Sequence, residues 1–333
     1  MVKIGVAGAG HLGKIHIKCI QSAQGLSLVG FYDTDAGVRE KVAAEFGIKA
    51  FDDYNEMLRH CDAVDIVVPT IFHHKIAKKA IEAGKHIFIE KPITHTLAEA
   101  EELLDIAKQK KLKIQVGHVE RFNPAFLAIS QLALNPMFIE AHRLAAFNPR
   151  GTDVSVVLDL MIHDIDIILA CVKSEVKEIR ASGVSIISNT PDISNVRLEF
   201  ENGAVANLTA SRISMKQMRK LRIFQPDAYI SLDFLEKSSQ IIRLYNEEPE
   251  GREGTMLSLD TPAGSRFIEI EMPESAPVNA IQMELEKFCE AIVNDKQPIV
   301  SGEQGYHALK LALKVLDEIE EHTLRATKMN TNA

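Results

Sequence analysis

The chain opens with a short apolar run that leads directly into a glycine-rich turn. Residues 4–13 read Ile-Gly-Val-Ala-Gly-Ala-Gly-His-Leu-Gly, which gives Gly8, Gly10 and Gly13 the spacing G-x-G-x-x-G. The first glycine permits a tight turn, the second lets the backbone approach a pyrophosphate, and the third lets the next helix pack closely on the strand. Because a helix-compatible stretch follows, the pattern predicts a dinucleotide bound at a helix N-terminus.

The carboxylate of Asp33 distinguishes between the two nicotinamide dinucleotides. A second apolar run, Leu26–Tyr32, ends at Asp33, twenty residues after Gly13. A carboxylate there can accept hydrogen bonds from ribose hydroxyls, and it would repel a ribose phosphate. No arginine follows directly, since Arg39 is six residues further on. The sequence therefore predicts NAD rather than NADP. The predicted cofactor contacts in this segment are Gly8, Gly10, His11, Leu12, Gly13 and Asp33.

Length and composition exclude several classes of protein. The 333 residues suffice for two domains, and the formal net charge of −8 argues against a nucleic-acid surface. The four cysteines are far apart and form no C-x-x-C pair, which favours a reducing compartment. The most apolar helix candidate, Val156–Val172, carries several acidic residues, so we expect no membrane span. We expect a cytoplasmic protein.

The pattern of apolar residues along the chain changes near residue 120. Before that point, apolar runs alternate with helical patterns, which is typical of βαβ units around a parallel sheet. The expected strands there are Val2–Ala7, Leu26–Tyr32, Ala63–Val68, His86–Glu90 and Lys113–Gly117. From Ile179 onward short strand patterns follow one another, with Glu201-Asn202-Gly203 as the clearest hairpin turn. Two helices, Ala280–Asn294 and Gly305–His322, are expected near the end.

The predicted fold class is an α/β Rossmann domain followed by an α+β domain with a mostly antiparallel open sheet. The predicted domains are 1–120 for NAD binding and 121–325 for substrate binding and oligomerisation. A polar tail at 326–333 is expected to be frayed. The last helix, about 305–322, could instead pack back on the first domain.

Glu90-Lys91-Pro92 follows the predicted strand His86–Glu90. Strand carboxyl ends are where a parallel sheet presents its ligand crevice. A lysine there can lower its pKa by desolvation or act as a cation beside a reacting oxygen. Pro92 can fix an unusual turn, including one with a cis bond. Seen alone, this triplet favours a solvated lysine at a strand end.

Asp159 and His163 are four residues apart, so on a helix they share one face. A carboxylate can fix the tautomer of a histidine that acts as a general base. The alternative is a hydrogen-bonded histidine at a domain interface. A metal site is disfavoured because no third ligand is apparent. Pro69, Thr70 and His73, after the strand Ala63–Val68, could border the nicotinamide ribose, or could simply begin a helix.

Taken together, these motifs resemble the Gfo/Idh/MocA family of oxidoreductases. The resemblance covers nearly the whole chain and is carried by the glycine turn, Ala83-Gly84-Lys85-His86, Glu90-Lys91-Pro92, and Asp159 with His163. One departure is Thr70, where many members have asparagine. The resemblance implies that Lys91 and His163 flank the carbon that gives up hydride, with Asp159 nearby. Glu90 and Lys91 would also border the cofactor, and the open sheet would mediate a homodimer or homotetramer.

A narrower resemblance is to the branch that contains nucleotide-sugar 3-dehydrogenases. It is carried by the stretch 117–124 and by Leu160–Asp166. Arg121 could bind a diphosphate or sugar oxygen through its planar fork, and Asn123 could read a hydroxyl or amide. The alternative is that Glu120 and Arg121 form an internal ion pair. Arg212, Lys216, Arg219 and Lys220 could meet the diphosphate or form a solvated edge.

The reaction that we expect is oxidation of a secondary alcohol on a sugar ring, with NAD as the acceptor. The best single substrate hypothesis is the 3-hydroxyl of a UDP-N-acetylhexosamine. His163 would act as the base and Lys91 would stabilise the oxyanion, although the two roles can be exchanged. Rival hypotheses are an inositol or simple-sugar dehydrogenase, an NAD-dependent glycosidase, a non-catalytic NAD-binding regulator, and a biliverdin-type reductase.

Overall fold

The computed structural model describes residues 1–148, 154–247, 255–261, 264–274 and 277–331. Within the chain, two compact units separate: residues 1–122 with 278–310, and residues 123–277 with 311–333. The predicted boundary at 120 falls two residues from the observed one. However, the segment 278–310, which we assigned to the second domain, belongs to the first unit.

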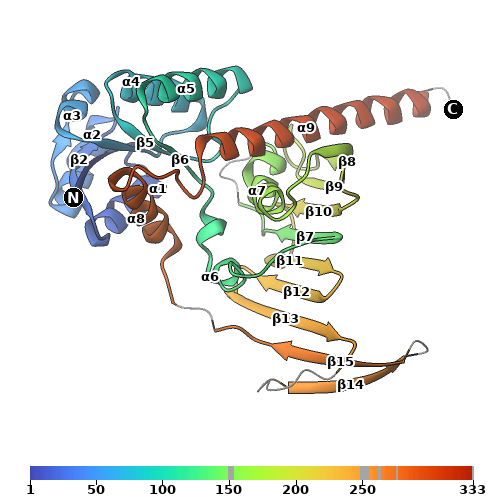
Figure 1. Cartoon of the computed structure of the whole chain (residues 1–333). Coiled ribbons are helices and arrows are strands. Elements are labelled where there is room, and N and C mark those ends of the chain that lie inside the picture. The colour runs from blue at the N-terminus through green and yellow to red at the C-terminus, as the bar shows by residue number, and fades with distance from the viewer. Residues whose placement is uncertain (149–153, 248–254, 262–263, 275–276, 332–333) are drawn as a thin grey trace. The chain divides into compact units, whose positions relative to one another are not determined.

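The first unit is built on a six-stranded parallel sheet in the order β3-β2-β1-β4-β5-β6 (Figure 1). The strands are β1 (Val2–Ala7), β2 (Leu26–Tyr32), β3 (Ala50–Phe51), β4 (Ala63–Ile66), β5 (His86–Glu90) and β6 (Ile114–Gly117). The helices are α1 (His11–Ser22), α2 (Ala36–Phe46), α3 (Tyr54–His60), α4 (His73–Glu82), α5 (Leu97–Lys110) and α8 (Ala280–Val293). Short 3-10 turns lie at η1 (Thr70–Phe72) and η2 (Val119–Phe122). The observed sheet confirms the predicted Rossmann fold class.

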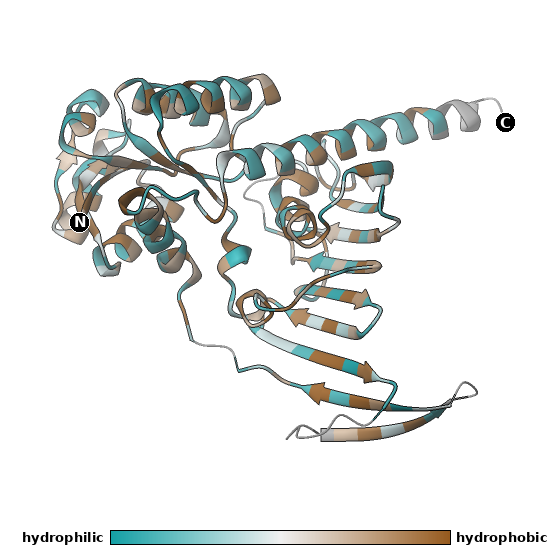
Figure 2. Ribbon diagram, viewed as in Figure 1, coloured by the Kyte–Doolittle hydropathy of each residue, from teal (hydrophilic) through white to brown (hydrophobic). Residues whose placement is uncertain are grey.

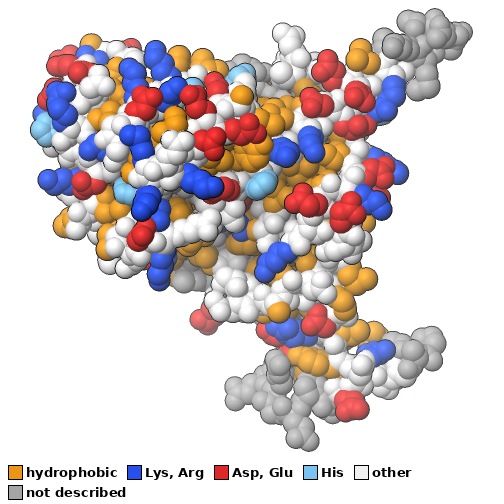
Figure 3. Space-filling model, turned by 45° about the horizontal axis from the view of Figure 1, so that its top comes forward, with side chains coloured by type: hydrophobic (Ala, Val, Ile, Leu, Met, Phe, Trp, Pro, Cys, Tyr) orange, Lys and Arg blue, Asp and Glu red, His pale blue; other side chains and the backbone are white. Residues whose placement is uncertain are grey.

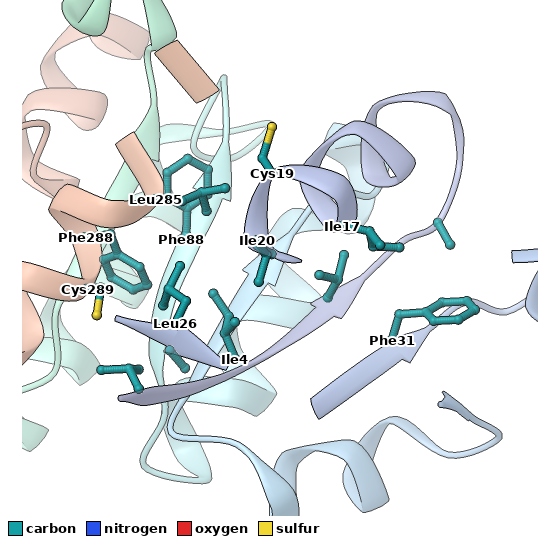
Figure 4. Packing of buried hydrophobic residues seen from close by; sticks show 14 of the residues in the cluster. Ile4, Ile17, Cys19, Ile20, Leu26, Phe31, Phe88, Leu285, Phe288 and Cys289 are labelled. Atoms are coloured by element: carbon teal, nitrogen blue, oxygen red, sulfur yellow. The ribbon is translucent and has the colours of Figure 1, made fainter. Parts of the chain in front are cut away.

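The core of the first unit explains why α8 belongs there. Leu285 and Phe288 of α8 are fully buried, together with Ile4, Ile17 and Phe88 from β1, α1 and β5. Figure 4 shows these side chains converging between the sheet and the two helices. The rings of Phe88 and Phe288 pack edge to face, with their centroids 6.0 Å apart. Burial of such side chains contributes about 2 kcal/mol each, so the apolar face of α8 stabilises this unit.

The second unit contains a nine-stranded sheet in the order β14-β15-β13-β12-β11-β7-β10-β9-β8. Its strands are β7 (Phe138–Leu144), β8 (Val176–Val184), β9 (Ile193–Phe200), β10 (Val205–Ser211), β11 (Met218–Gln225), β12 (Ala228–Asp233), β13 (Ser238–Tyr245), β14 (Thr255–Thr261) and β15 (Gly264–Glu271). Neighbouring strands are antiparallel except β7 and β10, which confirms the predicted mostly antiparallel sheet. Brown and teal alternate along several of these strands in Figure 2.

The helices of the second unit differ most from the sequence prediction. The stretch after η2 forms only the short helix α6 (Pro124–Leu127). The predicted helix over Val156–Val172 consists of a π-helical turn, η3 (Val157–Met161), followed by α7 (Ile162–Cys171). The final helix, α9 (Gly302–Thr331), begins in the first unit and ends in the second. It extends through most of the expected tail, because a polar segment without Pro or Gly can continue a helix.

Candidate active site

The glycine turn between β1 and α1 has no room for side chains at two of its three glycines. Gly8 has φ +97°, and a Cβ atom there would lie 2.5 Å from the Val67 carbonyl oxygen. A Cβ atom on Gly13 would lie 2.1 Å from the Gly8 carbonyl oxygen. At Gly10, by contrast, a Cβ atom would meet no protein atom within 4 Å. The third glycine therefore allows close packing, and the second leaves open space.

That open space lies at the N-terminus of α1. Gly10 is the N-cap of this helix, and no side chain caps it. The uncapped N–H groups and the positive end of the helix dipole form an anion site, which fits the pyrophosphate of NAD. His11 and Leu12 occupy the first turn with exposed side chains. The chain thus offers the cradle that the glycine spacing predicts.

Asp33 connects this turn to the end of β2. Its Oδ2 accepts a hydrogen bond of 2.8 Å from the Ala9 N–H, and its Oδ1 accepts one of 3.0 Å from the Asp35 N–H. Arg39 donates to the carbonyl oxygens of Asp33 and Thr34, and it pairs with Asp52 at 3.2 Å. The Arg39 guanidinium is thus held by these oxygens. A carboxylate at the end of β2, with Arg39 held by these oxygens, fits NAD.

His73 joins the turn after β4 to the turn after β5. Its Nδ1 lies 2.9 Å from the Pro92 carbonyl oxygen, and its Nε2 lies 2.9 Å from the Val68 carbonyl oxygen. Burial lowers the pKa of His73, and the two carbonyl acceptors oppose that shift. The side chain is 1% exposed, so His73 braces the turn instead of lying on the crevice surface. Pro69 is exposed and Thr70, the first residue of η1, is half-buried.

Lys91 follows directly after β5, at the carboxyl edge of the parallel sheet, and is half-buried. The bond from Lys91 to Pro92 is cis, which is one of the turns that the sequence suggested. The Glu90 side chain is 12% exposed, and its Oε2 lies 3.2 Å from the Lys91 backbone nitrogen, which donates to it. The carboxylate of Glu90 therefore contacts the backbone of the turn that carries Lys91.

The sequence analysis missed a group of buried polar side chains behind this turn. His16 lies between Asp65 and Glu90, and the buried carboxyl of Glu284 contributes to the same electrostatic environment. The available signal was Asp65, a carboxylate in the otherwise apolar strand Ala63–Ile66. Its partner His16 is 49 residues away in the chain. Periodicity alone does not reveal such a pair.

Asp159 and His163 belong to the second unit and are both half-buried. Asp159 lies in the π-helical turn and His163 is the second residue of α7, so the segment is not the uniform α-helix that we expected. A π-helical turn is rare, and such turns are frequent at functional sites. Asp164, next to His163, is paired with Arg143 of β7 in a buried ion pair, which the sequence analysis also missed.

The residues proposed for substrate recognition have different environments. Arg121 is half-buried in η2, directly after β6. Asn123 is 7% exposed and caps α6: its side-chain oxygen accepts from the Ala125 N–H, and its Nδ2 donates to the Phe234 carbonyl oxygen. Asn123 thus has a structural task that the sequence did not reveal. Its predicted role in reading a hydroxyl or amide of the substrate stays a prediction.

The basic cluster after β10 does not form one surface. Arg212 is 5% exposed, donates to the Val154 carbonyl oxygen and lies 3.8 Å from Asp192. Lys220 pairs with Asp233 at 3.2 Å, and Lys216 is exposed. Acidic and basic side chains are interspersed over the face shown in Figure 3. Across the described part of the chain, no group of three metal-ligating side chains occurs, and no helix is long and apolar enough to cross a membrane.

Comparisons with known proteins agree with this geometry. Residues 2–118 match the model of an oxidoreductase family with an NAD-binding Rossmann fold, and residues 139–230 match the GFO/IDH/MocA C-terminal domain. A UDP-N-acetylglucosamine 3-dehydrogenase of Acidithiobacillus ferrooxidans is 35% identical over 96% of this chain and 97% of its own length. A scyllo-inositol 2-dehydrogenase (NAD(+)) of Bacillus subtilis is 30% identical over 90% of this chain and 89% of its own.

The solved structures lead to the same family. The Acidithiobacillus ferrooxidans enzyme superposes with a TM-score of 0.87 at 34% identity, covering 96% of this chain and 98% of that one. The predictions of an oxidoreductase, of the sugar dehydrogenase class and of NAD as cofactor are confirmed by these matches. The glycine turn, the strand-end lysine and the two matched domain models together show that this chain belongs to the GFO/IDH/MocA oxidoreductase family.

Proposed function

We propose that this enzyme oxidises the 3-hydroxyl of a UDP-N-acetylhexosamine. The observation that carries the proposal is the 35% identity, over 96% of the chain, with a protein named UDP-N-acetylglucosamine 3-dehydrogenase. Lys91 at the carboxyl end of β5 supports it, because ligands of open parallel sheets bind at that edge. Arg121, directly after the neighbouring β6, offers a planar fork for the diphosphate.

In the reaction that we propose, the C3–H bond of the sugar breaks and a ketone forms at C3. NAD, when bound, accepts the hydride. His163 takes the hydroxyl proton on its imidazole, with Asp159 orienting the ring. Lys91 donates a hydrogen bond to the oxygen as negative charge develops on it. Gly8, Gly10, Gly13 and the N-terminus of α1 would hold the dinucleotide, and Asp33 would accept hydrogen bonds from its ribose hydroxyls.

The test uses purified enzyme with UDP-N-acetylglucosamine that carries deuterium at C3. Deuterium should appear in the reduced nicotinamide, and Lys91→Met should abolish its transfer while NAD binding persists. Lys108→Met, an exposed lysine on α5, is the matched control and should behave as the native protein. Unlabelled reduced nicotinamide would refute C3 as the reacting centre, and turnover by Lys91→Met would refute the role of Lys91.

A second candidate is a polyol dehydrogenase, which the 30% identity with a scyllo-inositol 2-dehydrogenase favours. The same assay with scyllo-inositol, myo-inositol and free hexoses separates the two. Reduction of NAD with free polyols but not with the nucleotide sugar would select this second function. In that case the roles proposed for Lys91, His163 and the cofactor site would stay the same.

We propose that the chain forms a homodimer or homotetramer through the sheet of the second unit. Phe224, Leu244, Leu257 and Leu259 are exposed. The strand registers place them on the sheet face opposite the buried Ile223, Ile230 and Ile241. Exposed apolar patches of this kind mark protein interfaces. Sedimentation of the native protein against Leu257→Lys measures this: an unchanged mass would refute the proposed interface.

We propose a cytoplasmic location. The four cysteines, Cys19, Cys61, Cys171 and Cys289, are free and buried. Free thiols are the rule in reducing compartments. Fractionation of the source cells, followed by immunodetection, tests this location, and recovery of the protein outside the cytoplasm would refute it.

A further inference from the structure

A histidine that is fully buried in the first unit bridges two carboxylates. His16 of α1 is 0% exposed; its Nδ1 lies 2.9 Å from Oδ2 of Asp65, and its Nε2 lies 3.2 Å from Oε1 of Glu90. A neutral imidazole can donate from only one nitrogen. A ring that faces a carboxylate on each side is therefore suited to the doubly protonated form. Burial alone would lower the pKa of His16, but Asp65 and then Glu90 raise it well above 6.5.

Glu90 connects this histidine to the catalytic turn. Its Oε2 lies 3.2 Å from the Lys91 backbone nitrogen, which donates to it. A Cβ atom at Gly117 would lie 2.8 Å from its Oε1, so the absent side chain of Gly117 makes room for the carboxylate. Burial would raise the pKa of Glu90, but the hydrogen bond and charge of His16, followed by the charge of Lys91, lower it.

The other titratable groups around His16 come from neighbouring elements. Glu284 of α8 is fully buried, and neither of its carboxyl oxygens has a hydrogen-bond partner among the described residues. Burial, followed by the charge of Glu90, raises the pKa of Glu284 well above 4.5. Cys19 of α1 and His73 of α4 also face this network, and burial raises the pKa of the Cys19 thiol. The two pKa shifts are thus opposite, since that of Glu284 is raised and that of Glu90 is lowered.

We propose that His16 is a positioning residue for Lys91. Its imidazolium holds the Glu90 carboxylate in place, and that carboxylate fixes the Lys91 backbone at the end of β5. The proposal rests on the function proposed above for Lys91, and it adds His16 as a residue that acts through Glu90. It predicts that removing the His16 charge alters catalysis through Glu90, with little change in cofactor binding.

Two substitutions of His16 separate its two contacts. His16→Gln can still donate toward Glu90 without a charge, whereas His16→Asn can reach only the Asp65 side. We expect kcat to fall about 10- to 100-fold in His16→Asn and less in His16→Gln, with the KM for NAD near the native value. In both variants the acid limb of the pH–rate profile should move to higher pH by about one unit, because Glu90 loses the cation that keeps it ionised.

A purely structural histidine would lower the rate equally at all pH values. The double-mutant cycle with Glu90→Gln decides the matter: His16→Asn should cost little further rate in the Glu90→Gln background. Glu284→Gln replaces a carboxyl whose pKa is raised well above 4.5 by an amide of similar size, and it should keep the native pH profile. Equal fold-losses with and without Glu90, or parallel pH profiles, would overturn the proposal.

One readout needs no substrate. In ¹⁵N-histidine NMR of the native protein, the resonances that disappear in His16→Asn should show both ring nitrogens protonated at neutral pH, and in Glu90→Gln the His16 pKa should fall. A neutral His16 at pH 7 would overturn the proposal even if Lys91 is essential. A protonated His16 in an enzyme that ignores every sugar would instead show failure of the proposed function.

Discussion

Arg143 and Asp164 form a bidentate ion pair inside the second unit. Nε of Arg143 lies 2.9 Å from Oδ2 of Asp164, and Nη2 lies 2.8 Å from Oδ1. The two side chains are 3% and 4% exposed. The pair ties β7 to α7 at the residue that directly follows His163. Because a fork-to-fork pair fixes orientation, it defines where this end of α7 lies on the sheet.

Asp164→Asn should lower the free energy of unfolding of the second unit by about 3 kcal/mol, because it removes the carboxylate that pairs with the buried Arg143 guanidinium. Arg143→Met combined with Asp164→Leu should recover much of that loss, since an apolar pair of similar size avoids the desolvation cost. Urea unfolding of the three proteins measures both effects. Equal stability of Asp164→Asn and the native protein would contradict this account of the pair.

Gly10 and Gly13 offer a matched pair of substitutions in one turn. Gly13→Ala should destabilise the first unit, since its Cβ would lie 2.1 Å from the Gly8 carbonyl oxygen. Gly10→Ala should fold normally, because a Cβ there meets no protein atom within 4 Å and the backbone has φ −67°. It should nevertheless weaken NAD binding about 10-fold or more, because the methyl group enters the space expected for the pyrophosphate.

Thermal melting and NAD titration of the two variants check this contrast. If Gly10→Ala binds NAD as tightly as the native protein, the open space at the α1 N-terminus is not the cofactor cradle. If Gly13→Ala melts at the native temperature, the turn can relax more than its geometry indicates.

The elements of the first unit were predicted well because a pattern within a short stretch of sequence marks each of them. β1, β2 and β5 have the predicted bounds, since each is a complete apolar pattern that ends at turn residues. The two-residue β3 was missed because so short a strand has no period. Helix α8 was predicted as a helix but placed in the wrong unit. Its apolar face indicates that the helix packs against a core. The core residues that cover this face, however, lie more than 180 residues earlier in the chain.

The candidate site was predictable where function depends on short motifs. The glycine turn, Asp33 and Lys91 follow directly from strand ends, whose position a parallel sheet dictates. His16 and Arg143 were not found, because a buried ion pair depends on a partner that only the tertiary fold supplies. The capping role of Asn123 was missed for a related reason: an asparagine before proline fits both a substrate contact and a helix cap, and the structure shows the cap while the substrate contact stays a prediction.

A substitution that removes the charge of Asp33 also tests the cofactor site. Asp33→Asn keeps the size of the side chain but loses the carboxylate that accepts from the Ala9 N–H. We expect the KM for NAD to rise about 10-fold, with a smaller change for NADP, because a neutral amide no longer repels a ribose phosphate. Glu40→Gln on α2 is the charge-matched control, since Glu40 is exposed. Equal changes in both variants would point to net charge alone.

Asp192 should make the second unit sensitive to acid. Its Oδ2 accepts from the N–H groups of Ile186 and Ile187 at 2.7 Å each and from that of Ser188 at 3.1 Å. Burial opposes ionisation, but the hydrogen bonds of Ile187, Ile186 and Ser188 outweigh it and lower the pKa of Asp192 to about 2, from 3.8. The unfolded state therefore binds the proton more readily, and stability rises with pH across this window.

The contribution of Asp192, roughly 2 kcal/mol, should be complete above pH 4 and should vanish as the pH falls toward 2. Asp192→Asn should accordingly unfold at lower urea concentration than the native protein at pH 6, and the difference should shrink between pH 4 and pH 2. Glu201→Gln, an exposed carboxylate in the hairpin between β9 and β10, should show no such difference. A pH-independent gap between Asp192→Asn and the native protein would mean that the loop depends on the shape of the carboxylate and not on its charge.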